Sequence, residues 1–269
     1  SLPDYDLNQR VSITDNIYTN KITLGVYELG SVFKTFTVAA GLENKVINSN
    51  TIFKNLKHSL TCDKYTISEH DKLPSNLSAE QILIRSSNIG AVRIVQKVGI
   101  EKYKNFLNSL ELLEMIEFDL EETGTPLPFR WGKCKLATSS YGHGITTTPL
   151  QLAKGYAIIS NGGFEINPTI IKENSEKMIK YKKRIIKENV SEQINPILRK
   201  IVTSKEGTAN LADVIGYEIG GKTGTAEKII SGRYAPQKKL NTFASVFPIS
   251  NPKFVLVVIL DEPQINEEY

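Results

Sequence analysis

One short pattern in the sequence pairs a nucleophile with a base. It is Ser31-Val32-Phe33-Lys34. Residues three apart on a helix share a face, so the Lys34 amine can reach the Ser31 hydroxyl and take its proton. A lysine has a pKa of about 10.4 in water and acts as a neutral base near pH 7 only when it is desolvated or lies beside another cation. Ser31 is therefore a candidate catalytic nucleophile and Lys34 its candidate base.

A second pattern, Ser86-Ser87-Asn88, offers a hydroxyl and an amide on what the flanking residues predict to be a loop between helices. The Ser86 hydroxyl suits proton relay, and the Asn88 amide suits a hydrogen bond to a substrate backbone. Both residues are therefore candidate catalytic residues.

A third pattern, Lys222-Thr223-Gly224, lies in a predicted strand after the glycines at 220–221, where missing side chains would let a ligand approach the backbone. Lys222 can bind a carboxylate and can be the cation that lowers the pKa of Lys34. The strand edge can pair with a peptide, and the Thr225 N–H can join that of Ser31, at a helix start, as an oxyanion hole. Lys222 is thus a candidate catalytic residue, and Thr223, Gly224 and Thr225 are candidate substrate-binding residues.

Taken alone, each pattern has an ordinary structural explanation. Ser-x-x-Lys occurs again at 250–253, where it precedes a strand, and Ser-Ser-Asn is a common helix cap. An isolated Lys34 would be a surface lysine, and 220–224 a glycine-rich hairpin. The order of the three patterns and the elements that carry them favour the chemical interpretation.

Helical periodicity dominates the first part of the chain and strand-like runs the last. The helices predicted from apolar spacing, capping and stop signals cover 31–44, 78–113 with a break at 85–88, 149–161 and 191–202. The strands predicted from β-branched and aromatic runs cover 217–227, 241–247 and 253–260. Successive strands joined by short loops predict an antiparallel sheet covered by helices, an α/β fold of the α+β type with a helical subdomain and without βαβ alternation.

The composition is that of a globular protein, with 40% hydrophobic and 23% charged residues. The formal charge of +4 is spread among nearly as many acids as bases, which argues against nucleic-acid binding. Cys62 and Cys134 are too few for a disulfide framework and lack metal-ligand spacing, so free thiols and no metal are expected. No run approaches the roughly 18 to 20 apolar residues of a membrane span, so any anchor is expected outside this sequence.

The three patterns form a known signature of penicillin-binding proteins and class A β-lactamases. The chain resembles class B penicillin-binding proteins over nearly its whole length, through the motifs at 28–34, 141–145, 148–153, 207–209, 222–227 and 261–263. In the first of these motifs, Leu29 replaces the family's proline. Within that family, 142–144 and 207–227 resemble septal, division-type members more than elongation-type members.

The resemblance implies a penicillin-binding protein transpeptidase fold over 1–269, trimmed at both ends, with the helical subdomain within about 45–200 and with membrane anchor and N-terminal pedestal domain absent. It implies a peptidoglycan D,D-transpeptidase that cross-links D-Ala-D-Ala stem peptides through a serine acyl-enzyme, uses no cofactor and is inhibited by β-lactams. The expected place is the periplasmic side of the bacterial inner membrane, and the expected partners are a glycan polymerase and division proteins. Two family strands before residue 1 and a final helix are expected to be missing from this sequence, so the expected sheet has three strands and exposed edges.

Two other classes share the signature. A serine β-lactamase or D,D-carboxypeptidase needs a second base to activate water, but Glu117, Glu121 and Glu122 lie in a segment that resembles the penicillin-binding pattern instead. A β-lactam-sensing receptor domain would be a binding module, and such sensors usually replace the asparagine that is present here as Asn88. His143 is expected to be structural, since the family's chemistry uses no histidine.

Overall fold

The computed structural model of the protein describes residues 6, 8, 19–63, 65–172, 183–230 and 232–264. The helices and helical turns are η2 (Gly30–Phe33), α1 (Lys34–Glu43), α2 (Ala79–Ile84), α3 (Asn88–Val98), α4 (Ile100–Ser109), α5 (Lys133–Ser139), α6 (Pro149–Ser160), α8 (Glu188–Thr203) and η3 (Asn210–Ala212). The strands are β1 (Ile52–Phe53), β2 (Ser59–Cys62), β3 (Tyr65–Ser68), β4 (Leu77–Ser78), β5 (Gly220–Ile230), β6 (Arg233–Phe247) and β7 (Phe254–Asp261).

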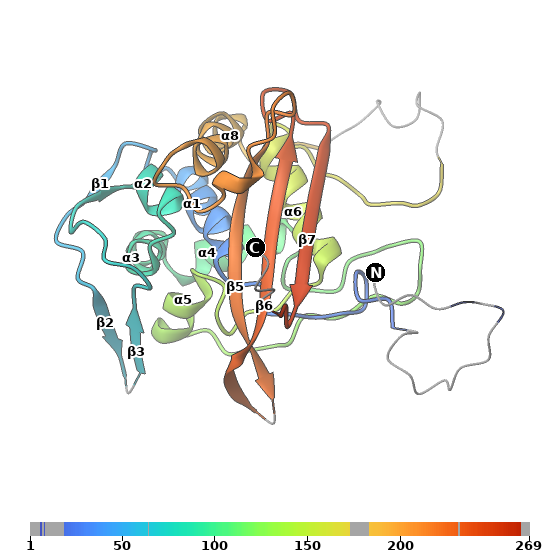
Figure 1. Cartoon of the computed structure of the whole chain (residues 1–269), viewed down its shortest axis with the longest axis horizontal. Coiled ribbons are helices and arrows are strands. Elements are labelled where there is room, and N and C mark those ends of the chain that lie inside the picture. Colours follow the sequence, from blue (N-terminus) through green and yellow to red (C-terminus); the bar gives the residue numbers. More distant parts are fainter. Residues whose placement is uncertain are drawn as a thin grey trace.

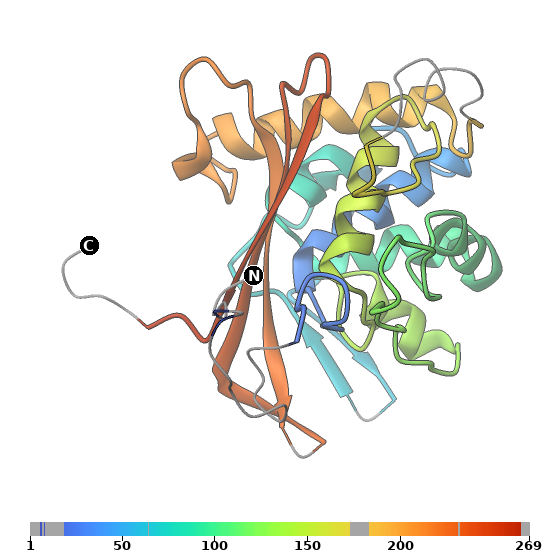
Figure 2. The ribbon, with the colours of Figure 1, turned by 90° about the vertical axis from the view of Figure 1, so that its right-hand side faces the viewer.

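The largest sheet is antiparallel in the order β5-β6-β7 (Figure 1). Seen edge-on in Figure 2, it has the helices packed on one of its faces. Residues alternate along β7, where Phe254, Leu256, Val258 and Leu260 are exposed and the residues between them are half-buried. This alternation follows from the two-residue period of a strand, which sends successive side chains to opposite faces. β5 is an edge strand of this sheet, and it packs against α8 and η2.

Helix α1 is central to the helical layer, and every residue from Lys34 to Leu42 is buried. Its buried polar side chains Lys34, Thr35 and Thr37 all have hydrogen-bond partners, as burial of polar groups requires. Two buried tyrosines hold the helix and the turn before it. The Tyr156 hydroxyl donates to the Val32 carbonyl oxygen over 2.9 Å, and the Tyr103 hydroxyl lies 3.0 Å from Thr37 Oγ1. The pKa of both tyrosines is raised by burial, so both stay neutral hydrogen-bonding groups.

The predicted elements are confirmed in kind, with differences at their ends. The capping box at Ser78 and the first-turn Pro149 are both present, and the predicted break lies between α2 and α3. The first helix opens with the 3-10 turn η2 that contains Ser31. The β5–β6 hairpin extends well past Glu227, the predicted end of its first strand. The sequence pattern missed this extension because charged residues occupy both of its faces, so no apolar alternation marks it.

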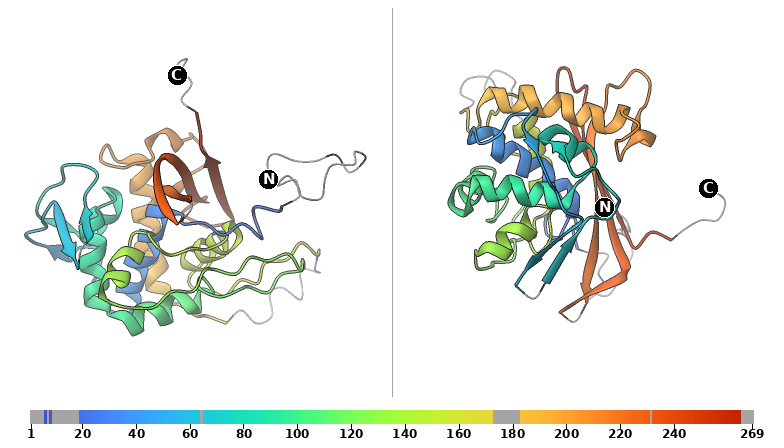
Figure 3. Two further views of the ribbon diagram at one scale, coloured as in Figure 1. Left: turned by 90° about the horizontal axis from the view of Figure 1, so that it is seen from below. Right: turned by 90° about the vertical axis from the view of Figure 1, so that its left-hand side faces the viewer.

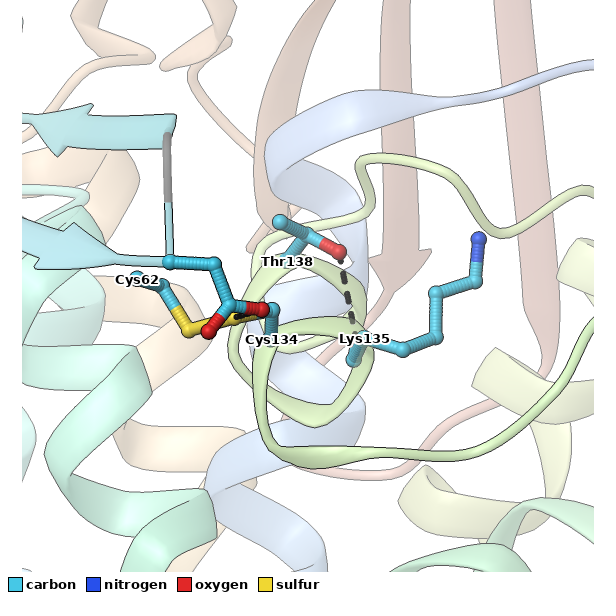
Figure 4. Close-up of a disulfide and its surroundings, with 5 residues drawn as sticks. Cys62, Cys134, Lys135 and Thr138 are labelled. Carbon is cyan, nitrogen blue, oxygen red and sulfur yellow. Dashed lines mark hydrogen bonds between the residues drawn. A yellow bond between two sulfur atoms is a disulfide. The ribbon is translucent and has the colours of Figure 1, made fainter.

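The expectation of free thiols was wrong, because Cys62 and Cys134 form a disulfide (Figure 4). The two cysteines are separated by 72 positions in sequence, yet folding brings their Cα atoms to 5.6 Å. Cys62 ends β2 and Cys134 lies in the first turn of α5, so the bond ties the β2–β3 hairpin to that helix. The two cysteines come together only through the tertiary packing of β2 and α5. Their spacing in the sequence therefore could not predict the disulfide.

The described ranges contain neither a membrane span nor a cluster of metal-binding side chains. No helix among these residues is long and apolar enough to cross a bilayer. No group of three or more His, Cys, Asp or Glu side chains in the same part of the chain is arranged to hold a metal ion.

Candidate active site

The three sequence patterns meet at one cavity of about 160 Å³ between the sheet edge and the helices. Its walls include Ser31 from η2, Ser86 from the loop between α2 and α3, and Thr223, Gly224 and Thr225 from β5. Segments about 50 and 190 positions from Ser31 in sequence therefore face the same space. Lys34, Asn88 and Lys222 do not line the cavity. They are buried behind its wall.

Close backbone packing brings η2 and β5 together. Gly30 has a φ of +62°, a region that favours glycine, and a Cβ added there would meet the Thr225 carbonyl oxygen at 2.4 Å. A Cβ added at Gly224 would meet the Leu29 carbonyl oxygen at the same distance. Both glycines are thus required for the backbone of Thr225 to lie beside the turn that carries Ser31.

The explanation predicted for Gly220 and Gly221 was wrong. The space beside Gly220 is filled by the Ile249 side chain and that beside Gly221 by the Phe243 ring and the Ala244 carbonyl. These two glycines serve packing within the protein, whereas Gly224 is the glycine of this strand that reaches the cavity wall.

Lys34 and Lys222 both donate to the hydroxyl of Ser86. Each Nζ lies 3.0 Å from Ser86 Oγ. Lys34 Nζ also donates to the Ser86 carbonyl oxygen, and Lys222 Nζ donates to the Thr223 carbonyl oxygen over 2.9 Å. Ser86 thus offers both its carbonyl oxygen and its hydroxyl to Lys34 Nζ. Its φ is 58°, and such a positive φ is rare for a non-glycine residue and occurs more often at functional sites.

The two lysine side chains are fully buried, which disfavours their charged forms. Burial, followed by the nearby charge of Lys222, lowers the pKa of Lys34 well below its usual range, while Glu69 opposes this shift. Burial also lowers the pKa of Lys222 to about 7. The pair can therefore supply one neutral amine and one cation near neutral pH.

Asn88 is held at the first turn of α3. Its Nδ2 donates to the Ser68 carbonyl oxygen over 2.8 Å, which leaves its Oδ1 as an acceptor without a hydrogen-bond partner among the described residues. Thr223 Oγ1 lies 2.7 Å from Thr208 Oγ1, and both threonines line the cavity. Thr208 was recognised in the sequence only as part of the family motif at 207–209.

His143 lies apart from the lysines, in an aromatic stack. Its ring is 5.9 Å from that of Tyr141 and 4.4 Å from that of Tyr234, and it does not line the cavity. Burial lowers its pKa, against the charges of Glu28 and Glu227, which favours the neutral ring near pH 7. Glu69, which lines the cavity and accepts hydrogen bonds from the Ser86–Asn88 segment, carried no recognisable signal in the sequence.

The site thus combines a serine at a helix start, a buried lysine one turn later and a second buried lysine on an adjoining edge strand. The chain belongs to the penicillin-binding protein transpeptidase domain family, whose model matches residues 1–269. This confirms the family inferred from the motifs.

Curated relatives agree with this assignment. The chain is 32% identical, over 99% of its length and 46% of the relative's, to a probable peptidoglycan D,D-transpeptidase FtsI of Caulobacter vibrioides. It is 30% identical, over 98% of its length and 43% of the relative's, to stage V sporulation protein D of Bacillus subtilis. The chain thus spans about half the length of these relatives.

Solved structures confirm the fold class. The apo transpeptidase domain of Burkholderia pseudomallei penicillin-binding protein 3 matches with a TM-score of 0.84 and 28% identity, over 91% of this chain and 74% of that one. Penicillin-binding protein 3 of Mycobacterium tuberculosis, complexed with aztreonam, matches with a TM-score of 0.81 and 25% identity, over 91% of this chain and 58% of that one.

Proposed function

We propose that the protein is a peptidoglycan D,D-transpeptidase that works through an acyl-enzyme on Ser31. The observation that carries the proposal is the pair of fully buried lysines sharing the Ser86 hydroxyl behind the cavity wall that Ser31 lines. Lysines are rarely buried without a functional or ion-pairing reason, and a strongly shifted pKa beside a nucleophile is typical of catalytic sites.

The proton path follows from the hydrogen bonds of Lys34. A neutral amine has two N–H groups and one lone pair. The carbonyl oxygen and the hydroxyl of Ser86 occupy the two N–H groups, so the lone pair remains to accept the Ser31 proton. Ser31 Oγ then bonds to the carbonyl carbon of the penultimate D-Ala, and the peptide bond to the terminal D-Ala breaks. The proton returns through Ser86 to the leaving amine. An acceptor amine later attacks the ester, the bond between the carbonyl carbon and Ser31 Oγ breaks, and the proton of the acceptor amine passes through Lys34 to Ser31 Oγ.

The other residues of the site bind and stabilise. The N–H groups of Ser31 and Thr225 stabilise the oxyanion, supported by the close backbone packing of Gly30 on Thr225. The hydroxyl of Thr223 receives the terminal carboxylate at the cavity wall, and the charge on Lys222 stabilises that carboxylate from behind the wall. The unpaired Oδ1 of Asn88 is assigned to an N–H of the donor peptide, which requires that peptide binding brings this buried oxygen to the cavity wall. The Gly224 segment of edge strand β5 pairs with the peptide backbone.

The biological setting is proposed from the family. The likeness of 142–144 and 207–227 to septal members supports a role in septal wall synthesis, and the neighbour solved in complex with aztreonam supports binding of β-lactams. The Cys62–Cys134 disulfide supports an oxidising compartment, hence the periplasmic side of the inner membrane. The proposed partners are a glycan polymerase and division proteins, and the proposed attachment to the membrane is through an anchor outside this sequence. Residues of about 45–200 are proposed to contain the helical subdomain.

Turnover of a chromogenic β-lactam tests the proposed function. We expect one covalent adduct per chain by intact-protein mass and no sustained hydrolysis after that first equivalent. We also expect exchange of the terminal D-Ala of a donor peptide for a labelled D-amino acid. Fast multiple turnover would assign the chain to the hydrolases, and a stable adduct without exchange would assign it to the sensors.

The pH profile of acylation tests Lys222. The second-order acylation constant should rise as Lys34 loses its proton and fall above about pH 7 as Lys222 loses its own. Removal of the cation in Lys222→Ala raises the pKa of Lys34, because a nearby positive charge disfavours its protonated form. The rising limb should therefore move to higher pH and the falling limb should disappear.

Lys228→Ala is the matched control, because Lys228 belongs to the same strand but is ion-paired with Asp261 at 2.7 Å. Its profile should match that of the unmodified protein. If Lys222→Ala weakens β-lactam capture but keeps the rising midpoint, Lys222 anchors the carboxylate without lowering the pKa of Lys34.

A further inference from the structure

Glu69 places a buried carboxylate against the Ser86–Asn88 loop. It follows β3 directly and is 8% exposed. Its Oε1 accepts from Ser87 Oγ over 2.5 Å and from the Ile89 N–H over 3.1 Å. Its Oε2 accepts from the Asn88 N–H over 2.7 Å. One side chain thus binds three consecutive residues of the loop and of the first turn of α3.

These bonds fix the loop more firmly than the loop's own capping does. The backbone N–H groups of a first helical turn have no partner within the helix, and Ser87 caps only that of Gly90, over 2.9 Å. A carboxylate at a helix N-terminus forms strong, charge-assisted hydrogen bonds there. Ser86 comes immediately before the three residues that Glu69 binds, so its positive φ and its bonds to both lysines depend on the same anchor.

Glu69 is also held by its own hairpin, where its N–H donates to the His58 carbonyl oxygen over 2.9 Å. Ile67, two residues earlier on β3, packs in an apolar cluster with Ile89 and Val92 of α3 and Ala137 of α5. The Cys62–Cys134 disulfide ties the same hairpin to α5 (Figure 4). Figure 1 and the right-hand view of Figure 3 show the hairpin extending below α3.

We propose that Glu69 is a positioning residue for the acylation of Ser31, an inference that rests on the function proposed above. It transmits the fixed position of the β2–β3 hairpin to the Ser86 hydroxyl and the Asn88 amide. Through Ser86 it sets the distance between the proton relay and the two lysines. Its negative charge also stabilises the protonated form of Lys34, so it tunes the base as well as the geometry.

The same carboxylate has a competing role. It lines the cavity that contains Ser31, where a glutamate can activate water and release the acyl group. Its hydrogen bonds argue against this role, since three donors already occupy its two oxygens and hold the side chain against the loop. Positioning affects formation of the acyl-enzyme, whereas water activation affects its breakdown.

Stopped-flow acylation of the 269-residue chain by a chromogenic cephalosporin separates the two roles. Glu69→Gln keeps the shape of the side chain but loses its charge. It also replaces one carboxylate oxygen, which accepts hydrogen bonds from the loop, by an NH₂ group that can only donate. We expect its limiting acylation rate to fall about 100-fold, the size of effect that a displaced catalytic group produces, with little change in the non-covalent binding constant. The rising limb of its pH profile should move to lower pH, because the charge that favours protonated Lys34 is gone. The deacylation rate should stay as in the unmodified protein.

Glu69→Asp and Glu80→Gln complete the set. Glu69→Asp keeps the charge on a shorter side chain. Its pH profile should therefore keep the midpoint of the rising limb, and its acylation rate should lie between those of Glu69→Gln and the unmodified protein. If Glu69→Gln does not fold, Glu69→Asp still tests the inference through its reduced acylation rate. Glu80 lies on the neighbouring helix α2, and its carboxylate pairs with Lys200 at 2.6 Å. The Glu80→Gln variant should therefore acylate at the normal rate.

Three results overturn the inference. Normal acylation by folded Glu69→Gln with an unmoved limb removes the positioning role and leaves the proposed function standing. Normal acylation with slower deacylation makes Glu69 a hydrolytic base. Absence of any adduct on the unmodified protein overturns the proposed function and this inference together.

Discussion

We expect a Ser31→Ala variant to carry no penicillin adduct by intact-protein mass, whereas the unmodified chain should gain one equivalent. The reason is that Ser31 is the nucleophile proposed to form the covalent bond, and an alanine offers no oxygen. Ser31 is only half-buried at a turn fixed by Gly30, and alanine fits the same helical start, so the substitution should leave the thermal unfolding midpoint nearly unchanged.

The chain provides its own control for this experiment. The second Ser-x-x-Lys match begins at Ser250, which lies in the turn between β6 and β7. The Ser250 hydroxyl donates to Glu218, which precedes β5. Ser250 does not line the cavity that contains Ser31. Ser250→Ala should therefore label like the unmodified protein, and peptide mapping should place the adduct on Ser31. An adduct that persists on Ser31→Ala, or maps to Ser250, would remove Ser31 from its proposed role.

Local chemistry explains why Ser31 and Lys34 could be found in the sequence. Their relation is one helical turn, which sequence spacing encodes directly. The meeting of that turn with Ser86 and Lys222 is a tertiary event, and only the resemblance to a family predicted it. The structure then adds what no motif specifies, namely that both lysines donate to the same hydroxyl.

The features that the sequence did not predict have a common physical cause. Glu69 acts on residues 18 to 20 positions later through three hydrogen bonds, and Cys62 pairs with a cysteine 72 positions later. Neither relation leaves a periodic pattern. The short strands β1 to β4 are two to four residues long, too short for alternation to be recognised. The β-structured part of the helical region was therefore missed.

The second large effect is expected from Lys34→Arg, which should lower the second-order acylation constant about 1,000-fold, within the range that general-base catalysis contributes. Arginine keeps the positive charge but does not lose its proton in proteins, so no neutral amine remains to accept the Ser31 proton. Lys34→Met removes the base without leaving a charge in a fully buried site, and it should show a loss of similar size. Agreement between the two variants separates loss of the base from the cost of burying a guanidinium.

Lys154→Arg is the matched control, because Lys154 is also buried, on α6, but pairs with Glu111 at 2.6 Å. It should acylate at nearly the normal rate, since its charge has a partner and it does not line the cavity that contains Ser31. Circular dichroism and thermal unfolding establish that each variant is folded. A folded Lys34→Met that acylates at the normal rate would show that another group takes the proton from Ser31, and the Ser86 hydroxyl, which accepts from Lys222 as well, would then be the group to test next.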